Sequence, residues 1–194
     1  MRRALIVIPL LAVLTLSGCG INTIPADKER VQAAWSQVLN EYQRRADLIP
    51  NLVATVKGYA RHERRVLTEV TDARSRVTTM HVPSNILTNP KAFHAFERNQ
   101  ATLGAALSRL MSVTENYPNL KANQNFLTLQ AQIEGTENRI AVARRDYILA
   151  VRRYDTELVT YPGRWWQETL YKNYKVMQNF TISQQAMQVP KVHF

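Results

Sequence analysis

The sequence predicts an all-α fold: an antiparallel bundle of three to four long helices, followed by a short C-terminal aromatic helix and an irregular tail. Apolar residues recur in steps of three and four over long stretches, which is the period of one helix face. No segment alternates apolar and polar residues well enough to form a strand. The 194 residues also contain only 6 glycines. Heptad-like stripes of this kind pack as helical bundles.

The first long helix is expected to follow Asp27, a residue type that often caps a helix. Its apolar stripe starts at Val31 and keeps the same phase past Pro50 as far as Val77. Proline has no N–H and crowds the carbonyl four residues earlier, so Pro50 must interrupt the hydrogen-bond ladder. Either one long helix is kinked there, or a second helix starts with Pro50 in its first turn. The preserved phase favours the kink.

A loop and a second helical stripe follow. Residues 78–90, "TTMHVPSNILTNP", lose the apolar period and contain two prolines. Asn89 and Pro90 together favour a helix start, because Asn caps the first turn and Pro is tolerated within it. The stripe of the next helix comprises Phe93, Phe96, Leu103, Leu107, Leu110 and Tyr117.

The last long helix is expected to start at Pro118, after "ENYPN" at 115–119 has ended the previous one. Its seam runs from Phe126 to Tyr161 in steps of three and four. After Pro162 and Gly163, "RWWQETLYKNYK" predicts a short aromatic helix. Residues 176–194 are expected to be irregular and to lie along the bundle.

The N-terminus has the order of an export signal. Arg2 and Arg3 precede an uncharged run, 4–16, and the small residues Ser17 and Gly18 precede Cys19, which is the single cysteine. The run of 13 residues is shorter than the roughly 20 needed to span a bilayer as a helix. "LSGC" resembles a bacterial lipobox, which implies cleavage between Gly18 and Cys19 and attachment of acyl chains such as palmitate to Cys19. The alternative is an uncleaved signal anchor with an incidental cysteine.

These features predict three segments: a signal peptide at 1–18, a lipidated tether at 19–26 and a helical bundle domain at 27–194. The chain carries a formal net charge of +10, and the basic excess survives removal of Arg2 and Arg3. An exported basic protein meets anionic lipid, envelope polymers or acidic proteins, so nucleic acid is not an expected partner. Gly20 after the cysteine resembles the outer-membrane sorting pattern of lipoproteins.

Polar residues interrupt the seam of the last long helix at Gln130, Glu137 and Arg144. A lone buried charge is prohibitive, so these side chains need partners if they face inward. The hypothesis is a polar layer in which Glu137 meets Arg44 or Arg45 and Arg144 meets Asp47. The alternative is a slight rotation that turns Leu129, Thr136 and Ala143 to the core and leaves the charges at its margin.

Signals for metal binding and catalysis are poor. None of the four histidines has a Glu three residues before it, as a di-iron bundle requires. His62-Glu63 begins like a zinc-protease helix, but Val66 stands where the second ligand would be. The chain has no Gly-rich phosphate loop and no Gly-x-Ser-x-Gly elbow. The sequence therefore predicts no metal site, no cofactor and no enzymatic activity.

Two surface features remain. Lys57, Arg61, Arg64 and Arg65 are expected on neighbouring turns of one helix, where they form either an anion-binding patch or an ordinary solvated face. The aromatic residues of 164–175 either form an interfacial membrane helix or cap the open end of the bundle. Capping is the favoured interpretation.

Long stretches of the chain resemble the LemA family of bacterial membrane-associated proteins. They are "QRRADLIPNLVATVKGYARHE" (43–63), "ENYPNLKANQNFLTLQAQIEGTENRIAVARRDY" (115–147), "TYPG" (160–163) and "PKVHF" (190–194). The resemblance implies a bundle of long helices outside the cytoplasm and supplies no catalytic residue. Members commonly carry a transmembrane anchor, whereas this chain has the lipobox-like signal instead. The motif residues it carries over are Gln43, Arg44, Arg45, Asp47, Pro50, Asn51, Glu115, Asn116, Tyr117, Pro118, Glu137, Asn138 and Arg139.

The function expected from these features is a non-enzymatic interaction or scaffold module of the cell envelope, anchored to a membrane through Cys19 and binding a protein partner. A sensor or carrier that binds an anionic lipid or small ligand at the Arg-rich surface is the alternative. A metal-free enzyme would require a cleft with strongly perturbed titratable groups.

Overall fold

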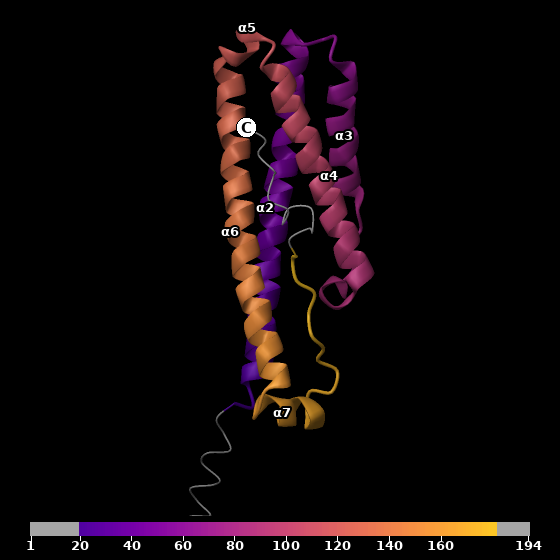
Figure 1. Ribbon diagram of the computed structural model, residues 1–194, viewed down its shortest axis with the longest axis vertical. Coiled ribbons are helices and arrows are strands. Elements are labelled where there is room, and N and C mark those ends of the chain that lie inside the picture. The colour runs from indigo at the N-terminus through magenta and orange to yellow at the C-terminus, as the bar shows by residue number, and fades with distance from the viewer. Residues whose placement is uncertain (1–19, 182–194) are drawn as a thin grey trace, which may run out of the picture.

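The computed structural model describes residues 20–181 and confirms the all-α bundle, with no strand among those residues. Figure 1 shows α2 and α6 running side by side over most of the length of the bundle, while α3 and α4 pack against its upper part. In chain order the elements are α2 (Thr23–Tyr59), α3 (Arg64–Thr79), the 3-10 helix η1 (Ile86–Thr88), α4 (Pro90–Thr114), α5 (Pro118–Lys121), α6 (Gln124–Val159) and α7 (Gly163–Thr169).

Helix α2 is continuous through Pro50, as the preserved apolar phase indicated. Because Pro50 has no N–H, the carbonyl of Ala46 loses its partner in the helix ladder. The Nε–H of Arg74, from α3, donates a hydrogen bond to that carbonyl at 2.9 Å. A side chain of a neighbouring helix thus repairs the break, so α2 can run its full 37 residues.

The expectation that the helical stripe continues from Pro50 to Val77 is wrong. The chain reverses between Ala60 and Glu63, and α3 folds back onto α2 and α4. A single helix would leave the apolar stripe of α3 in water, whereas the reversal buries Leu67, Val70 and Ala73. Burying one aliphatic side chain of this size contributes roughly 1.5–3 kcal/mol.

The helix caps agree only in part with the sequence. Asn89 accepts a hydrogen bond from the N–H of Ala92 at 3.2 Å, as expected for a cap before Pro90. Pro118 opens only the one-turn α5, and α6 starts afresh with Asn123 accepting from the N–H of Phe126 at 3.1 Å. Asp27 is not a cap, because α2 already starts at Thr23, within the expected tether, and Asp27 is buried inside the helix.

The core consists of two hydrophobic clusters that follow each other along the bundle. The lower one is aromatic: the ring centroid of Trp35 lies 5.1 to 6.2 Å from those of its neighbours. The upper cluster is mostly aliphatic. The neighbours of Trp35 are Phe93, Phe96, Tyr147 and Phe180, and the upper cluster includes Ile49, Leu52, Val56, Leu103, Leu110 and Ile133.

Of the irregular tail predicted at 176–194, the structure describes residues 176–181, and these lie along the bundle as expected (Figure 1). The hydroxyl of Tyr147 donates to the carbonyl of Gln178 at 2.6 Å, and the N–H of Gln178 donates to the carbonyl of Leu87 at 2.7 Å. Met177 and Phe180 are buried against the aromatic cluster. An irregular segment thereby forms part of the core between α6 and η1.

Candidate functional site

A polar layer separates the two hydrophobic clusters, and Arg45 is its centre. The guanidinium of Arg45 donates to Oε1 of Glu137 at 2.7 Å and to Oε1 of Gln100 at 2.8 Å. A longer bond, at 3.3 Å, goes to the carbonyl of Gln100. The side chain of Arg45 is 4% exposed, whereas that of Glu137 is 47% exposed. The buried charge therefore belongs to α2, and its counter-ion lies at the edge of the core.

Each of the three residues interrupts an apolar stripe between the clusters. Arg45 lies between Tyr42 and Ile49 on α2, and Gln100 lies between Phe96 and Leu103 on α4. On α6, Glu137 falls between Ile133 and Ile140. Buried Arg45 keeps its partners only when Gln100 and Glu137 lie at the same height along the bundle. Sliding any of the three helices along its axis would break these bonds, so the layer fixes their register.

The predicted contact between Glu137 and Arg45 is present, but the predicted contact between Asp47 and Arg144 is wrong. Asp47 is exposed and accepts a hydrogen bond from the amide of Gln43 at 2.8 Å. The guanidinium of Arg144 lies 4.3 Å from the ring centroid of Phe180. Since Asp47 points to solvent on α2, it cannot reach a side chain packed on the C-terminal segment.

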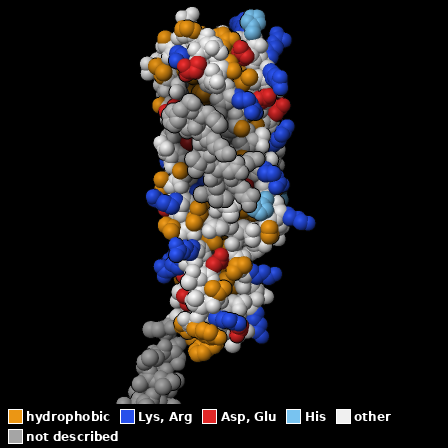
Figure 2. Space-filling view, viewed as in Figure 1, with side chains coloured by type: hydrophobic (Ala, Val, Ile, Leu, Met, Phe, Trp, Pro, Cys, Tyr) orange, Lys and Arg blue, Asp and Glu red, His pale blue; other side chains and the backbone are white. Residues whose placement is uncertain are grey.

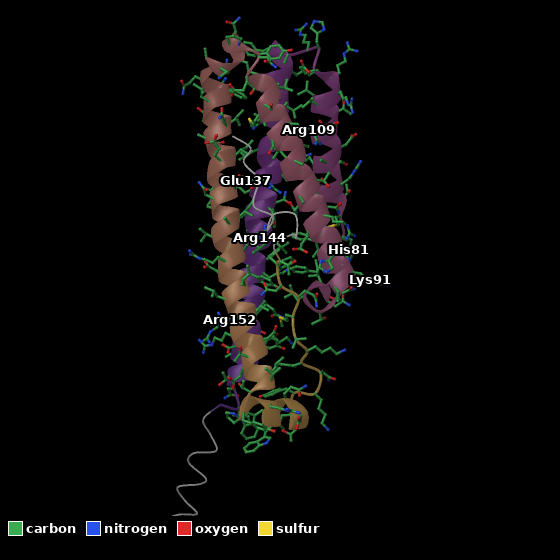
Figure 3. The ribbon with its side chains drawn as sticks, viewed as in Figure 1. His81, Lys91, Arg109, Glu137, Arg144 and Arg152 are labelled. Carbon is green, nitrogen blue, oxygen red and sulfur yellow. The ribbon has the colours of Figure 1, made fainter. Side chains whose placement is uncertain are left out.

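The rotated register of α6 is the one observed. Thr136 and Ala143 are buried, and Glu137 lies at the margin of the core (Figure 3). The contact with Arg45 survives this rotation because the long Arg side chain extends from α2 to the edge. The two alternatives drawn from the sequence are therefore compatible for this pair.

Two further charged pairs join α2 to α6, and the sequence analysis missed both. Glu41, 7% exposed, accepts from Nε–H of Arg139 at 3.0 Å. Asp27, 1% exposed, accepts from Nε–H of Arg153 at 3.1 Å. Both acids fall on the apolar stripe of α2: Asp27 lies four residues before Val31, and Glu41 lies three residues after Val38. That placement was the available signal.

A groove of about 600 Å³ lies beside the polar layer, between α4, α6 and the C-terminal segment. Arg45, Arg98 and Arg144 line it together with Glu97 and Glu137, which leaves an excess of positive charge. Burial raises the pKa of the Tyr42 phenol, which also lines it. Guanidinium groups remain protonated and can hold an anion, but they cannot act as a general base.

The remaining family-motif residues lie elsewhere and do not join the layer. Arg44 and Arg139 line a second groove, of about 630 Å³, on another face of the α2–α6 pair. Asn51 and Asn138 are exposed. Tyr117 donates its hydroxyl proton to the carboxylate of Glu63 at 2.9 Å and so ties the α2–α3 turn to the start of α5.

The expected basic patch does not lie on one helix. Lys57 belongs to the end of α2, Arg61 to the turn and Arg64 to the start of α3, and the reversal brings the three around a cavity of about 490 Å³. Asp72 also lines this cavity. The Arg65 side chain is 92% exposed, with Nε 3.6 Å from the Glu69 carboxylate. We call Lys57, Arg61 and Arg64 the basic turn.

Some predictions fall on residues that the structure does not describe, and others predict that a feature is absent. Gly18, Cys19 and the signal peptide at 1–18 lie outside the described residues, as do His193 and the rest of 182–194. Within residues 20–181, no three His, Cys, Asp or Glu side chains gather as a metal site would require. Over the same residues, none of the helices combines the length and the apolar character of a membrane span.

Comparison with known proteins gives one consistent family. Residues 34–194 match the sequence model of the LemA family. Magnetosome proteins MamQ 1 and MamQ 2 of Paramagnetospirillum magneticum are each 28% identical over 82% of this chain and 66% of their own length. Protein LemA of Metamycoplasma hominis is 22% identical over 72% of this chain and 60% of its own length. This chain therefore spans less than two thirds of each relative.

The matched region starts at residue 34, within the first third of α2, and contains every described element after it, together with the polar layer. It also contains all the segments on which the resemblance was based. The chain belongs to the LemA family.

Proposed function

We propose that this protein is a membrane-anchored, non-enzymatic helical-bundle protein of the cell envelope, which serves as an interaction or scaffold module. The observation that carries the proposal is the position of the two ends of α2. Gly20, next to Cys19 in sequence, lies at one end of the bundle, and the basic turn lies at the other. A lipid on Cys19 would thus attach a long helical body by its base.

The length of α2 sets how far the basic turn lies from the anchor. At 1.5 Å per residue, 37 residues extend about 55 Å. That distance exceeds several Debye lengths at physiological salt, so an upright bundle places the basic turn beyond the electrostatic influence of its own membrane. The partner suited to this turn is an acidic protein.

The polar side chains inside the bundle support a structural role over a catalytic one. Arg45 is engaged by Gln100 and Glu137, and Asp27 and Glu41 are each engaged by an Arg of α6. Because these groups already bond one another, they suit a role in fixing the register of the helices rather than in binding a substrate. Membership of the LemA family supports the proposed association with a membrane.

A sensor or carrier for an anionic ligand is the second candidate, and the cavity at the basic turn favours it. In residues 20–181, none of Lys57, Arg61 and Arg64 has a carboxylate oxygen within ion-pair distance. Arg guanidinium forks match phosphate and carboxylate groups, and a Lys ammonium beside them adds a positive point charge. The same 55 Å argument disfavours a lipid of the anchoring membrane as this ligand.

Mass spectrometry of the native protein, purified from membranes, tests the anchor. We expect an N-terminus at Cys19 that carries acyl chains, and loss of both in Cys19→Ser. An intact Met1 with an unmodified thiol would refute the lipid anchor.

Photo-crosslinking in intact cells tests the interaction role. A photoreactive residue at Arg61 should capture a defined acidic protein, and the same residue at Arg145, 70% exposed on α6, should not. Capture should also fail in Arg64→Glu. Equal capture from both positions would contradict the proposal. Saturable binding of inorganic phosphate that is lost in Arg64→Glu, without any captured protein, would favour the carrier instead.

A further inference from the structure

Exposed hydrophobic side chains gather at the end of the bundle where the chain enters. Val159, Tyr161, Trp165 and Leu170 are 58 to 63% exposed, and they are four of the nine large hydrophobic side chains that are exposed in residues 20–181. Figure 2 shows the patch as the orange surface at the lower tip, over α7. We call these four residues the aromatic end.

The aromatic end is packed both within itself and, through its neighbour Trp166, against the bundle. The Tyr161 and Trp165 rings pack edge to face, with centroids 5.2 Å apart. Trp166, the next residue of α7, is half-buried against the lower hydrophobic cluster. Adjacent residues on a helix point about 100° apart, so Trp166 caps the bundle while Trp165 faces outward. The capping and interfacial interpretations of this segment therefore apply to different residues.

The attachment point of the chain lies directly beside the aromatic end. A Cβ placed on Gly20 would be 3.8 Å from Pro162 Cγ and from Trp166 Nε1, so Gly20 lies within ordinary contact distance of the start of α7. The hydroxyl of Tyr171 donates to the carbonyl of Ile21 at 3.0 Å, which fixes the first described residues to the segment after α7. Cys19 is one residue away, and consecutive Cα atoms are about 3.8 Å apart.

The charges around this end suit a lipid surface. Lys172 is exposed, and Lys28 lies 4.3 Å from the Tyr174 ring centroid. Arg164 is half-exposed and paired with Glu168. Trp and Tyr favour the headgroup level of a bilayer, because one part of each ring system is apolar and the other bonds to water. Lysines beside them are attracted to anionic headgroups.

We propose that the aromatic end is a second membrane contact, in which Tyr161, Trp165 and Leu170 enter the headgroup region of the bilayer that holds Cys19. This inference rests on the proposed anchor. Two acyl chains already give stable attachment, so the second contact determines orientation rather than affinity. A bundle held at both points stands upright and keeps the basic turn far from the bilayer.

Fluorescence quenching tests this contact on the protein as purified from membranes, reconstituted in phosphatidylethanolamine and phosphatidylglycerol vesicles. Lipids brominated near the headgroup should quench the emission that is lost in Trp165→Phe, at least twofold more strongly than lipids brominated near the chain ends. Trp35 is buried in the core and serves as an internal reference.

A second measurement reads orientation. A dye on Arg61→Cys should transfer little energy to a lipid-bound acceptor, and transfer should rise severalfold when Trp165→Ser or Leu170→Ser is added. The matched control is Leu149→Ser, a 55% exposed leucine on the side of α6, which should change nothing. Circular dichroism confirms that each variant remains helical.

The two proposals fail separately. An acylated Cys19 together with Trp165 emission that ignores brominated lipids would overturn the membrane contact and leave the anchor standing. A Cys19 without lipid would overturn the anchor, and the quenching of Trp165 would still report whether the aromatic end meets the bilayer. Equal loss of quenching in Trp165→Phe and Leu149→Ser would also overturn the contact.

Discussion

The guanidinium of Arg74 donates a hydrogen bond to the main-chain carbonyl of Ala46, at 2.9 Å and across two helices. That carbonyl would pair with the N–H of residue 50 in an ordinary helix, but residue 50 is proline. The carbonyl that Pro50 leaves without a helical partner is therefore hydrogen-bonded by a side chain of α3. The same bond fixes the height at which α3 packs on α2.

Removing this bond should destabilise the fold only while the proline is present. We expect Arg74→Ala to lower the free energy of unfolding by about 1–3 kcal/mol, because the partly buried carbonyl loses its partner. In a Pro50→Ala background the helix supplies its own N–H, so the same substitution should cost about 1 kcal/mol less. Chemical denaturation of the four proteins measures the coupling. Equal costs in both backgrounds would show that Arg74 acts through packing alone.

Substitutions of Arg45 and of Glu137 in the polar layer should differ strongly in how much they lower the free energy of unfolding. We expect Arg45→Ala to cost about 2–5 kcal/mol, because it leaves a cavity and an unpaired Gln100 inside the core. Glu137→Gln should cost about 1 kcal/mol or less, since the Glu137 side chain is 47% exposed and screened by water.

Replacing Arg45 by an apolar side chain of similar length tests whether its ion pair or its packing contributes the stability. Arg45→Met should recover most of the loss in Arg45→Ala, because a buried ion pair contributes little net stability compared with good packing. Thermal unfolding followed by circular dichroism gives the order. If Arg45→Met were as unstable as Arg45→Ala, the ion pair itself would be the main source of stability.

The apolar period was sufficient to predict the helices but not every reversal between them. Three-and-four spacing located the buried faces of α2, α4 and α6, and the prolines marked the loop before α4 and the break after it. The reversal at 60–63 carries no proline, and the apolar phase resumes across it. The available signals were Gly58 and the charged run 61–65, which has no apolar residue to bury.

The polar pairs were harder to predict, because a stripe does not show which helix carries a given partner. Glu137 was correctly matched to an Arg of α2, since a charge on a seam must be compensated. The predicted contact of Asp47 with Arg144 is wrong, because residues close together along α2 do not all share one face. Phe180, which packs against Arg144, is on an irregular segment that has no period to interpret.

Asp155 should make stability fall as pH rises through the acid range. Burial raises the pKa of its carboxyl above the usual range, and the Met177 N–H, which donates to Oδ1 at 3.0 Å, partly opposes this. A raised pKa means that the folded state binds the proton more tightly than the unfolded state. The contribution of the proton is therefore complete at low pH and is lost as pH rises through the folded pKa.

Asp155→Asn tests this sign, because Asn can still accept from Met177 without carrying a charge. The free energy of unfolding of the variant, relative to the native protein, should increase as pH rises above the ordinary Asp pKa of 3.8 and level off at higher pH. Asp146→Asn, at a side chain that is 58% exposed, is the matched reference. A difference curve for Asp155→Asn that is flat or falls with pH would contradict the assigned cause.

Gly163 should tolerate no side chain, because it is buried where α7 turns against the end of α6. A Cβ on Gly163 would overlap the main-chain oxygen of Glu157, and backbone atoms cannot move aside as the end of a flexible side chain can. We expect Gly163→Ala to cost about 1–3 kcal/mol and to displace α7, together with the exposed ring of Trp165. Gly58→Ala is the matched control: its Cβ would meet nothing within 4 Å, and Ala favours the helix by about 0.5–1 kcal/mol. Urea unfolding should therefore move the two midpoints in opposite directions. A stabilised Gly163→Ala would mean that α7 is free to shift, and the rigid placement of the aromatic end would then have no structural basis.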